Sequence, residues 1–143
     1  MRELKTRPIP VPTEITQPYW DGAKQHKLMI QRCKRCGTYY HLPIASCPKC
    51  AGNQEAKLIF EEVSGKGLIF THTLIRDSRM KGFEDIMPYP VVLVELVEQP
   101  RLIHYGNMPT TKIEDIRIGL PVEVMFIEIG DGFTLPDFQI VGV

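Results

Sequence analysis

The sequence has few of the residues and motifs on which common enzyme families depend. Its 143 residues include only four cysteines, four histidines and one tryptophan. The patterns G-x-S-x-G, H-E-x-x-H, G-x-G-x-x-G and G-x-x-x-x-G-K-[ST] do not occur. Their absence argues against serine hydrolases, zinc peptidases, dinucleotide-binding domains and P-loop nucleotidases. We therefore predict no catalytic residue in this chain.

Long apolar stretches are also missing. The longest runs, such as residues 90–96, are far shorter than the roughly 20 residues that a membrane helix needs. The first fifteen residues lack the apolar segment and cleavage pattern of a secretion signal. We expect a cytoplasmic protein without a membrane partner, in a compartment where thiols stay reduced.

Acidic side chains are absent from residues 22–54, although the whole chain is neutral with 17 basic and 17 acidic residues. The basic residues of this segment are Lys24, Lys27, Arg32, Lys34, Arg35 and Lys49. Residues 57–143 carry eight basic and thirteen acidic residues, a net charge of −5. The basic segment either binds an anionic ligand or only offsets negative charge nearby. The acidic remainder argues against a groove that tracks a nucleic-acid backbone.

All four cysteines lie between residues 33 and 50, with the spacing C-x2-C-x10-C-x2-C. A C-x-x-C turn directs both sulfurs to one metal ion, and two such turns form a tetrahedral four-thiolate site. Gly37 and Gly52 supply the backbone freedom that these turns need. We predict that the four cysteines bind one metal ion; these ligands are Cys33, Cys36, Cys47 and Cys50. Zinc is expected, but iron stays open because tetrahedral sulfur coordination suits both metals.

A four-thiolate site is more suited to structure than to catalysis. Catalytic zinc keeps one position open for water, whereas four thiolates fill the coordination shell. Residues 28–53 are too few to bury a useful core. Metal binding worth roughly 10–16 kcal/mol would supply the folding free energy instead.

The rest of the chain predicts a mainly β fold with a short N-terminal helix. Thr16 and Pro18 indicate a helix start, and we expect the helix over residues 18–24. From residue 57 onward, five or six short segments rich in β-branched and aromatic residues alternate with turn sequences. This pattern favours a small closed barrel such as the five-stranded OB fold. We predict an extended and helical arm (1–27), a rubredoxin-like zinc ribbon (28–54) and an OB-fold barrel (55–143).

Several segments together resemble a known family. They are PYWDGAKQHKLMIQRCKRCGTYYHLP, CPKC, SGKGLIFTHT, YPVVLVEL and GLPVEVMF. They are similar to proteins that join a rubredoxin-like zinc ribbon to an OB fold and are found beside thiolases and HMG-CoA synthases. The resemblance extends from about Gln17 to Phe138. It implies a non-catalytic, acyl-CoA-associated protein that bridges a thiolase and an HMG-CoA synthase and helps to hold the CoA part of the intermediate.

Four regions are candidates for contact with a ligand or partner. The aromatic pair in the helix either packs in the core or stacks on a ligand. The basic residues of the ribbon face the partner enzyme or the CoA phosphates, and the SGKG segment is either a turn or a place of close ligand approach. The long loop 76–90 either docks a partner or lines a channel for the pantetheine arm. The candidate residues are Tyr19, Trp20, Arg32, Lys34, Arg35, Lys66 and Phe83.

Two other functions stay open from the residues. Zinc ribbons and OB folds also occur in proteins that bind single-stranded nucleic acid, although the charge of residues 57–143 argues against a nucleic-acid partner. With iron in place of zinc, the same paired C-x-x-C turns serve a rubredoxin-like electron carrier, which a visible spectrum would reveal.

Overall fold

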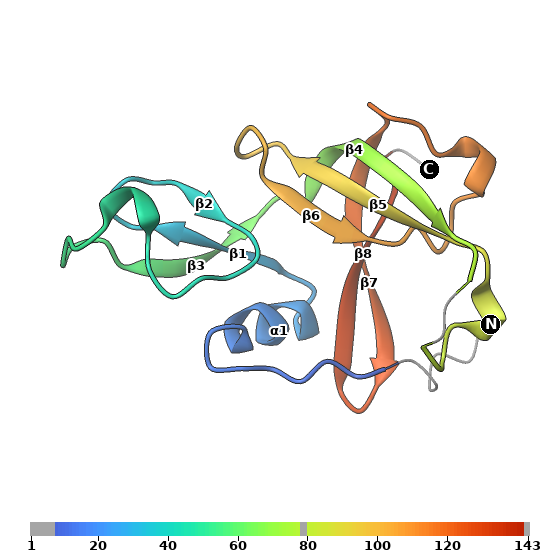
Figure 1. Cartoon of the computed structure of the whole chain (residues 1–143), viewed down its shortest axis with the longest axis horizontal. Helices are drawn as coiled ribbons and strands as arrows, with labels where there is room; N and C mark the ends of the chain where they lie inside the picture. Colours follow the sequence, from blue (N-terminus) through green and yellow to red (C-terminus); the bar gives the residue numbers. More distant parts are fainter. Residues whose placement is uncertain (1–7, 78–79, 142–143) are drawn as a thin grey trace.

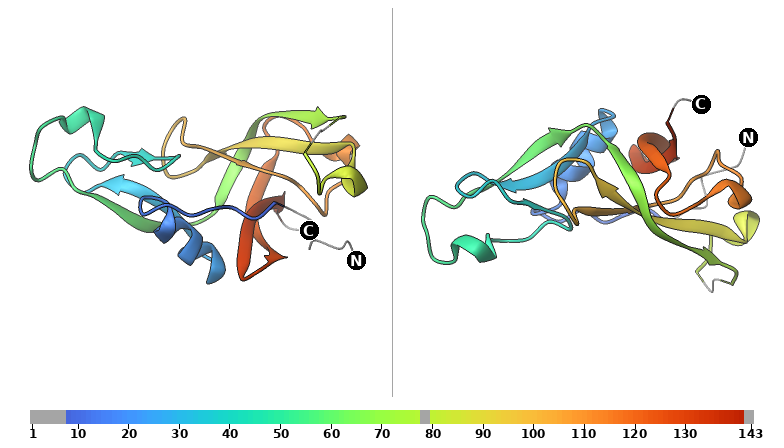
Figure 2. Two further views of the ribbon diagram at one scale, coloured as in Figure 1. Left: turned by 60° about the horizontal axis from the view of Figure 1, so that its bottom comes forward. Right: turned by 90° about the horizontal axis from the view of Figure 1, so that it is seen from above.

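The computed structural model describes residues 8–77 and 80–141, and it confirms the mainly β fold class. One sheet contains three strands in the order β2-β1-β3, and the other contains five in the order β6-β5-β4-β7-β8. Figure 1 and both views of Figure 2 show an elongated molecule, with the three-stranded sheet at one end and the five-stranded sheet at the other. Within the described residues, no helix is long and apolar enough to cross a membrane.

Helix α1 (Gln17–Lys24) lies where the sequence predicts it, and Pro18 stands in its first turn. Thr16 is the N-cap, but its hydroxyl accepts a hydrogen bond from the backbone N–H of Thr13 (2.8 Å) and makes no capping bond to the helix. The buried face of α1 packs on β1, since a Cβ at Gly22 would collide with the side chain of Met29. This contact fixes the helix against the three-stranded sheet.

The three-stranded sheet consists of β1 (Leu28–Cys33), β2 (Tyr39–Tyr40) and β3 (Leu58–Val63). Its strands are antiparallel, and β1 pairs with β3 along its whole length. Strand pairing therefore crosses the boundary predicted between residues 54 and 55. The predicted division into three segments stays a prediction.

The five-stranded sheet forms the nearly closed OB-type barrel that the sequence predicts. It contains β4 (Lys66–Ile75), β5 (Tyr89–Leu96), β6 (Ile103–Gly106), β7 (Pro121–Gly130) and β8 (Phe133–Ile140). The edge strands β6 and β8 meet beyond Gly106, where the Phe138 N–H donates to the Asn107 carbonyl (2.9 Å) and the Asn107 N–H donates to Asp137 Oδ1 (2.9 Å). Short 3-10 turns occur at Pro48–Cys50, Glu84–Ile86 and Ile113–Asp115.

One hydrophobic core joins both sheets. Leu28 and Ile30 of β1 belong to the same buried cluster as Val92, Val94 and Phe138 of the barrel. The alternation of buried and half-buried residues along β5 follows the two-residue period of a strand with one face on the core. A second, separate cluster forms around the cysteines. The ribbon and the barrel thus share a core, while the metal-binding turns pack apart from it.

Candidate metal centre and two cavities

The four cysteine side chains converge on one point. Their sulfur atoms all lie within 4.8 Å of one another, and the Cys36 and Cys47 sulfurs are 3.6 Å apart. A tetrahedron with metal–sulfur distances of about 2.3 Å has sulfur–sulfur edges of about 3.8 Å, so the cluster fits one ion. Three of the cysteines are buried and Cys36 is exposed. None of the four forms a disulfide within the described residues.

The local backbone explains this convergence. Cys33 ends β1, and the Gly37 N–H donates to the Cys33 carbonyl (2.8 Å), which closes the first C-x-x-C turn. Cys47 directly precedes the short turn Pro48–Cys50, and Cys50 is its last residue. Gly37 and Gly52 have φ angles of 76° and 79°, a region that favours glycine. The geometry therefore agrees with the ligand set that the cysteine spacing predicts.

Polar side chains around the sulfurs favour the thiolate form. The side chain of Thr38, whose Oγ1 lies 3.3 Å from the Cys36 sulfur, lowers the pKa of that thiol to about 6. The Tyr40 hydroxyl lies 3.1 Å from the Cys47 sulfur, and this hydrogen bond raises the pKa of Tyr40 to about 12. The Arg35 guanidinium donates to the Cys50 sulfur (3.3 Å) and acts to lower the pKa of that thiol, although burial and the neighbouring cysteines leave this pKa raised. Metal binding requires deprotonated thiols, so these contacts suit a metal site.

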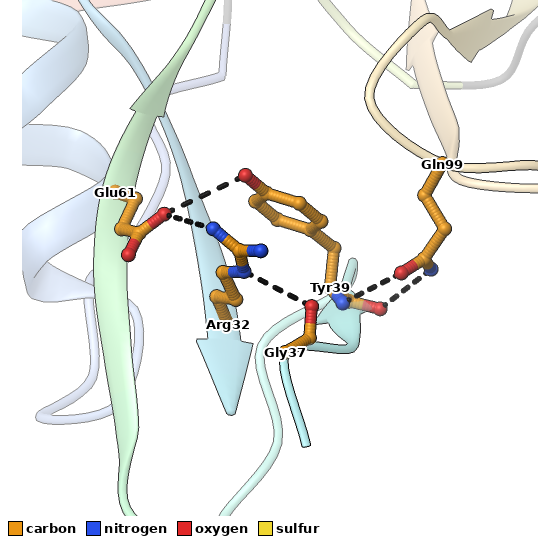
Figure 3. Close-up of polar contacts among 5 residues, drawn as sticks. All are labelled: Arg32, Gly37, Tyr39, Glu61 and Gln99. Atoms are coloured by element: carbon orange, nitrogen blue, oxygen red, sulfur yellow. Dashed lines mark hydrogen bonds and ion pairs between the residues drawn. The ribbon is translucent and has the colours of Figure 1, made fainter. Parts of the chain in front are cut away.

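Two of the three basic candidates of the ribbon have partners inside it. Arg32 forms an ion pair with Glu61 (3.1 Å), donates to the Gly37 carbonyl (3.0 Å) and lies 4.7 Å above the Tyr39 ring (Figure 3). Lys34 and Arg35 are both exposed, but the Arg35 guanidinium donates to the cysteine cluster. Of the three, Lys34 has the side chain that is most available to an anion. The predicted ligand contacts of all three stay predictions.

The SGKG segment connects β3 of the ribbon sheet to β4 of the barrel, so it is not a hairpin turn. A Cβ at Gly65 would collide with Val124, and one at Gly67 would collide with the Glu95 carbonyl. These glycines therefore allow the backbone to pack closely against neighbouring strands. Lys66 is exposed between them, and its predicted ligand contact stays a prediction.

Tyr19 and Trp20 line a cavity of about 350 Å³ between α1, the loop 41–43 and the edges of β6 and β8. The Tyr19 hydroxyl is 2.8 Å from His104 Nε2, and the rings of His41 and His104 stack at 4.5 Å with 14° between their planes. Trp20 makes an edge-on contact with Phe133. We call this space the aromatic cavity.

Burial keeps the polar rings of the aromatic cavity neutral. It lowers the pKa of His41 to about 4 and that of His104 to about 3, and the neighbouring His41 ring adds to the effect on His104. Burial also raises the pKa of Tyr19, with a further contribution from Asp137. Sequence analysis did not single out the two histidines as a pair, because no local pattern links positions so distant in the chain.

A second cavity of about 580 Å³ lies beside the loop that contains Phe83. Phe83 stacks on Tyr89 with ring centres 5.4 Å apart, and Ile86 and Met108 also line the space. We call it the loop cavity. The structure thus places Phe83 and Tyr19 at different cavities, although Asn107, Leu135 and Asp137 line both.

A four-cysteine ribbon joined to an OB-type barrel defines the class of protein to which the chain belongs. The family described as "ChsH2, rubredoxin-like zinc ribbon domain" matches residues 20–55, and that described as "ChsH2, C-terminal OB-fold domain" matches residues 60–126. The chain belongs to this family, whose members are also named DUF35 proteins.

Curated relatives fall into two groups. A DUF35 domain-containing scaffold protein of Methanocaldococcus jannaschii is 37% identical over 77% of this chain and 75% of its own length. A probable enoyl-CoA hydratase alpha subunit of Thermomonospora curvata is 35% identical over 93% of this chain. The chain spans only 40% of that subunit's length.

Solved structures agree with the fold. A chain of the Ltp2-ChsH2(DUF35) aldolase superposes with a TM-score of 0.80 and 31% identity, covering 92% of this chain and 98% of the other. A DUF35-family protein from Sulfolobus solfataricus superposes with a TM-score of 0.57 at 13% identity, over 89% of this chain and 85% of the other. The second likeness supports the fold alone.

Proposed function

We propose that this protein is a non-catalytic accessory subunit that docks on an acyl-CoA enzyme and stabilises the enzyme complex. The observation that carries the proposal is the likeness to the ChsH2(DUF35) chain of an aldolase complex, which covers 98% of that chain. Relatives named as scaffold proteins and as a hydratase alpha subunit support the same role. The finer proposal is that the partners are a thiolase and an HMG-CoA synthase, as the sequence resemblance implies.

In this proposal Cys33, Cys36, Cys47 and Cys50 hold a structural zinc ion. Four thiolates leave no open coordination position and no free thiol for acyl transfer. The metal would fix the turns that present Lys34 and the rest of the basic ribbon surface. Zinc gives a colourless protein, whereas iron would give a red oxidised form and favour the electron-carrier alternative. Elemental analysis together with a visible spectrum separates the two.

The loop cavity is the proposed site for the pantetheine arm of the acyl-CoA. Its volume of about 580 Å³ lies within the 300–1,000 Å³ range of ligand sites, and Phe83 and Tyr89 offer an apolar stacked wall. Lys112 also lines the cavity and can pair with an anionic group. Contact with CoA by this chain is a proposal that rests on these features and on the family resemblance.

The function is tested by capture and reconstitution. Zinc-loaded protein with an affinity tag should retain a thiolase-fold enzyme from lysate of its own host, identified by mass spectrometry. Adding the protein to that purified enzyme should change its rate of acyl transfer. Phe83→Ala should weaken the effect, whereas Val97→Ala, at an exposed turn away from both cavities, should leave it unchanged. Failure to retain or affect any acyl-CoA enzyme would contradict the proposal.

A further inference from the structure

The aromatic cavity has the size and wall composition of a small-molecule site. Its volume of about 350 Å³ falls in the range typical of ligand pockets. Its walls come from α1, the ribbon loop and the barrel edge, so the fold builds it from segments far apart in the chain. Aromatic and aliphatic side chains, including Trp20, Leu42 and Val91, make up most of the lining.

The charge of the walls argues against an anionic ligand. His41 and His104 are neutral at physiological pH, and the Tyr19 phenol stays protonated. Asp137 is the acidic residue among those that line the cavity, and its Oδ1 accepts a hydrogen bond from the Asn107 backbone. An anionic ligand would lose hydration here without gaining a cationic partner, which is costly.

One polar atom of a lining residue is buried without a hydrogen-bond partner. His104 is 3% exposed, its Nε2 pairs with the Tyr19 hydroxyl, and its Nδ1 has no hydrogen-bond partner within the described part of the chain. A buried polar atom without a partner costs about 1–3 kcal/mol. In a neutral imidazole one nitrogen donates and the other accepts. Nδ1 is therefore an acceptor if Nε2 donates to the Tyr19 hydroxyl, and a donor if Nε2 accepts from it. A carbonyl or a hydroxyl group can satisfy it.

We propose that the aromatic cavity binds a neutral, mainly apolar small molecule with one carbonyl or hydroxyl group, about the size of a two-ring compound. This inference goes beyond the proposed function, because the binding needs neither the partner enzyme nor CoA. The size and apolar lining of the cavity, the lack of a lysine or arginine among its lining residues and the unpartnered nitrogen of His104 support it.

Titration of the zinc-loaded full chain with three matched two-ring probes tests the proposal. The probes are alpha-tetralone, alpha-tetralol and the corresponding tetralin carboxylate. Trp20 is the only tryptophan and lines the cavity, so its fluorescence reports occupancy. We expect a saturable change with the ketone or the alcohol. The carboxylate should bind at least about tenfold more weakly, which corresponds to about 1.4 kcal/mol.

Two phenylalanine variants of β5 locate the binding. Val91 and Leu93 occupy the same half-buried face of the strand, but only Val91 lines the cavity. Val91→Phe should fill part of the space and weaken binding about tenfold, because a filled pocket rejects the ligand sterically. Leu93→Phe should leave the affinity within about twofold of the parent. Equal thermal unfolding of the two variants checks that both fold.

Phe83→Ala, which alters the loop cavity alone, should not change probe binding. The proposal is wrong if no probe gives a saturable response, or if the carboxylate binds as well as the neutral probes. It is also wrong if both β5 variants weaken binding equally, or if Phe83→Ala abolishes it. Tighter binding of N-acetylphenylalaninamide than of either neutral probe would assign the cavity to a partner's side chain instead. Each of these results leaves the capture experiment for the accessory function unaffected.

Discussion

The stacked pair of His41 and His104 joins the three-stranded sheet to the barrel through side chains. His104 lies in β6, His41 follows β2, and Tyr19 of α1 contacts both rings. The contact depends on neutral imidazoles, because two charged rings 4.5 Å apart would repel each other and could not be hydrated. The stability of the junction should therefore depend on pH.

We predict that the protein loses stability as the pH falls below about 6.5. The pKa of each histidine is depressed in the folded state, to about 4 for His41 and about 3 for His104, from an unfolded value of 6.5. Above pH 6.5 both states are neutral and the stability is fully present. Between 6.5 and the folded pKa only the unfolded state takes up the proton, at about 1.4 kcal/mol per pH unit for each ring. Thermal unfolding from pH 7.5 to pH 4.5 measures this slope.

His41→Phe should keep the ring contact and make the pH slope shallower by about the contribution of one imidazole. His72→Gln is the matched control, because His72 is exposed on β4 and should leave the slope unchanged. Comparing slopes between variants cancels the contribution of carboxylates common to all of them. An identical slope in His41→Phe and the parent would show that folding does not lower the pKa of His41.

The sequence predicted contacts between side chains only where the residues lie close together in the chain. The C-x-x-C pairs lie within a few residues of one another, so chain geometry already brings their sulfurs together. The contact of Tyr19 with His104 joins positions 85 residues apart, and no period or motif marks it. The ion pair of Arg32 with Glu61 also depends on β3 pairing with β1, which sequence analysis did not predict.

At the scale of elements, Gln99 connects the barrel to the ribbon. Its side chain accepts from the Tyr39 N–H (2.9 Å) and donates to the Tyr39 carbonyl (3.1 Å), in the way that an adjacent strand would (Figure 3). Gln99 lies in the β5–β6 connection, and Tyr39 lies at the edge of the three-stranded sheet. The pair of bonds fixes β2 against the barrel.

Gln99→Ala should lower the free energy of unfolding by about 1–3 kcal/mol, since each of the two hydrogen bonds contributes about 0.5–1.5 kcal/mol net. Hydrogen exchange at the Tyr39 amide should accelerate as well. Gln139→Ala is the control, because Gln139 donates to Glu123 between two barrel strands and does not reach the ribbon. Faster exchange at the Tyr39 amide in Gln139→Ala, or an unchanged rate in Gln99→Ala, would contradict the role of Gln99 in fixing β2 against the barrel.

The helix and most of the strands were predictable, because an early proline, runs of β-branched and aromatic residues and turn sequences act over short ranges. What the sequence left open was the sheet to which each strand belongs. The segment of β3 has an apolar composition similar to that of the barrel strands, and only its pairing with β1 assigns it to the ribbon sheet. Strand pairing between distant segments depends on tertiary packing, which local pattern does not report.

At the scale of the whole molecule, two separate clusters of buried residues stabilise different parts of the protein. The main core joins β1, α1 and the barrel. The smaller cluster contains Cys33, Cys47 and Cys50, with Tyr40, Ala56 and Leu58 packed against it. Because the small cluster has little apolar surface of its own, its order should depend on the metal, whereas the main core should not.

We predict that removal of the metal unfolds residues 34–57 and leaves the barrel folded. Amides of this segment should then exchange freely with deuterium, because no hydrophobic core replaces the bonds between metal and sulfur. Amides of Val92, Val94 and Val122 should keep their protection, since these residues are fully buried in the main core. Hydrogen exchange with mass spectrometry, before and after treatment with a chelator, measures both regions.

Readdition of zinc should restore protection in 34–57, and Cys47→Ser should reproduce the metal-free pattern. Simultaneous loss of protection in the barrel would mean that the ribbon and the barrel fold as one unit.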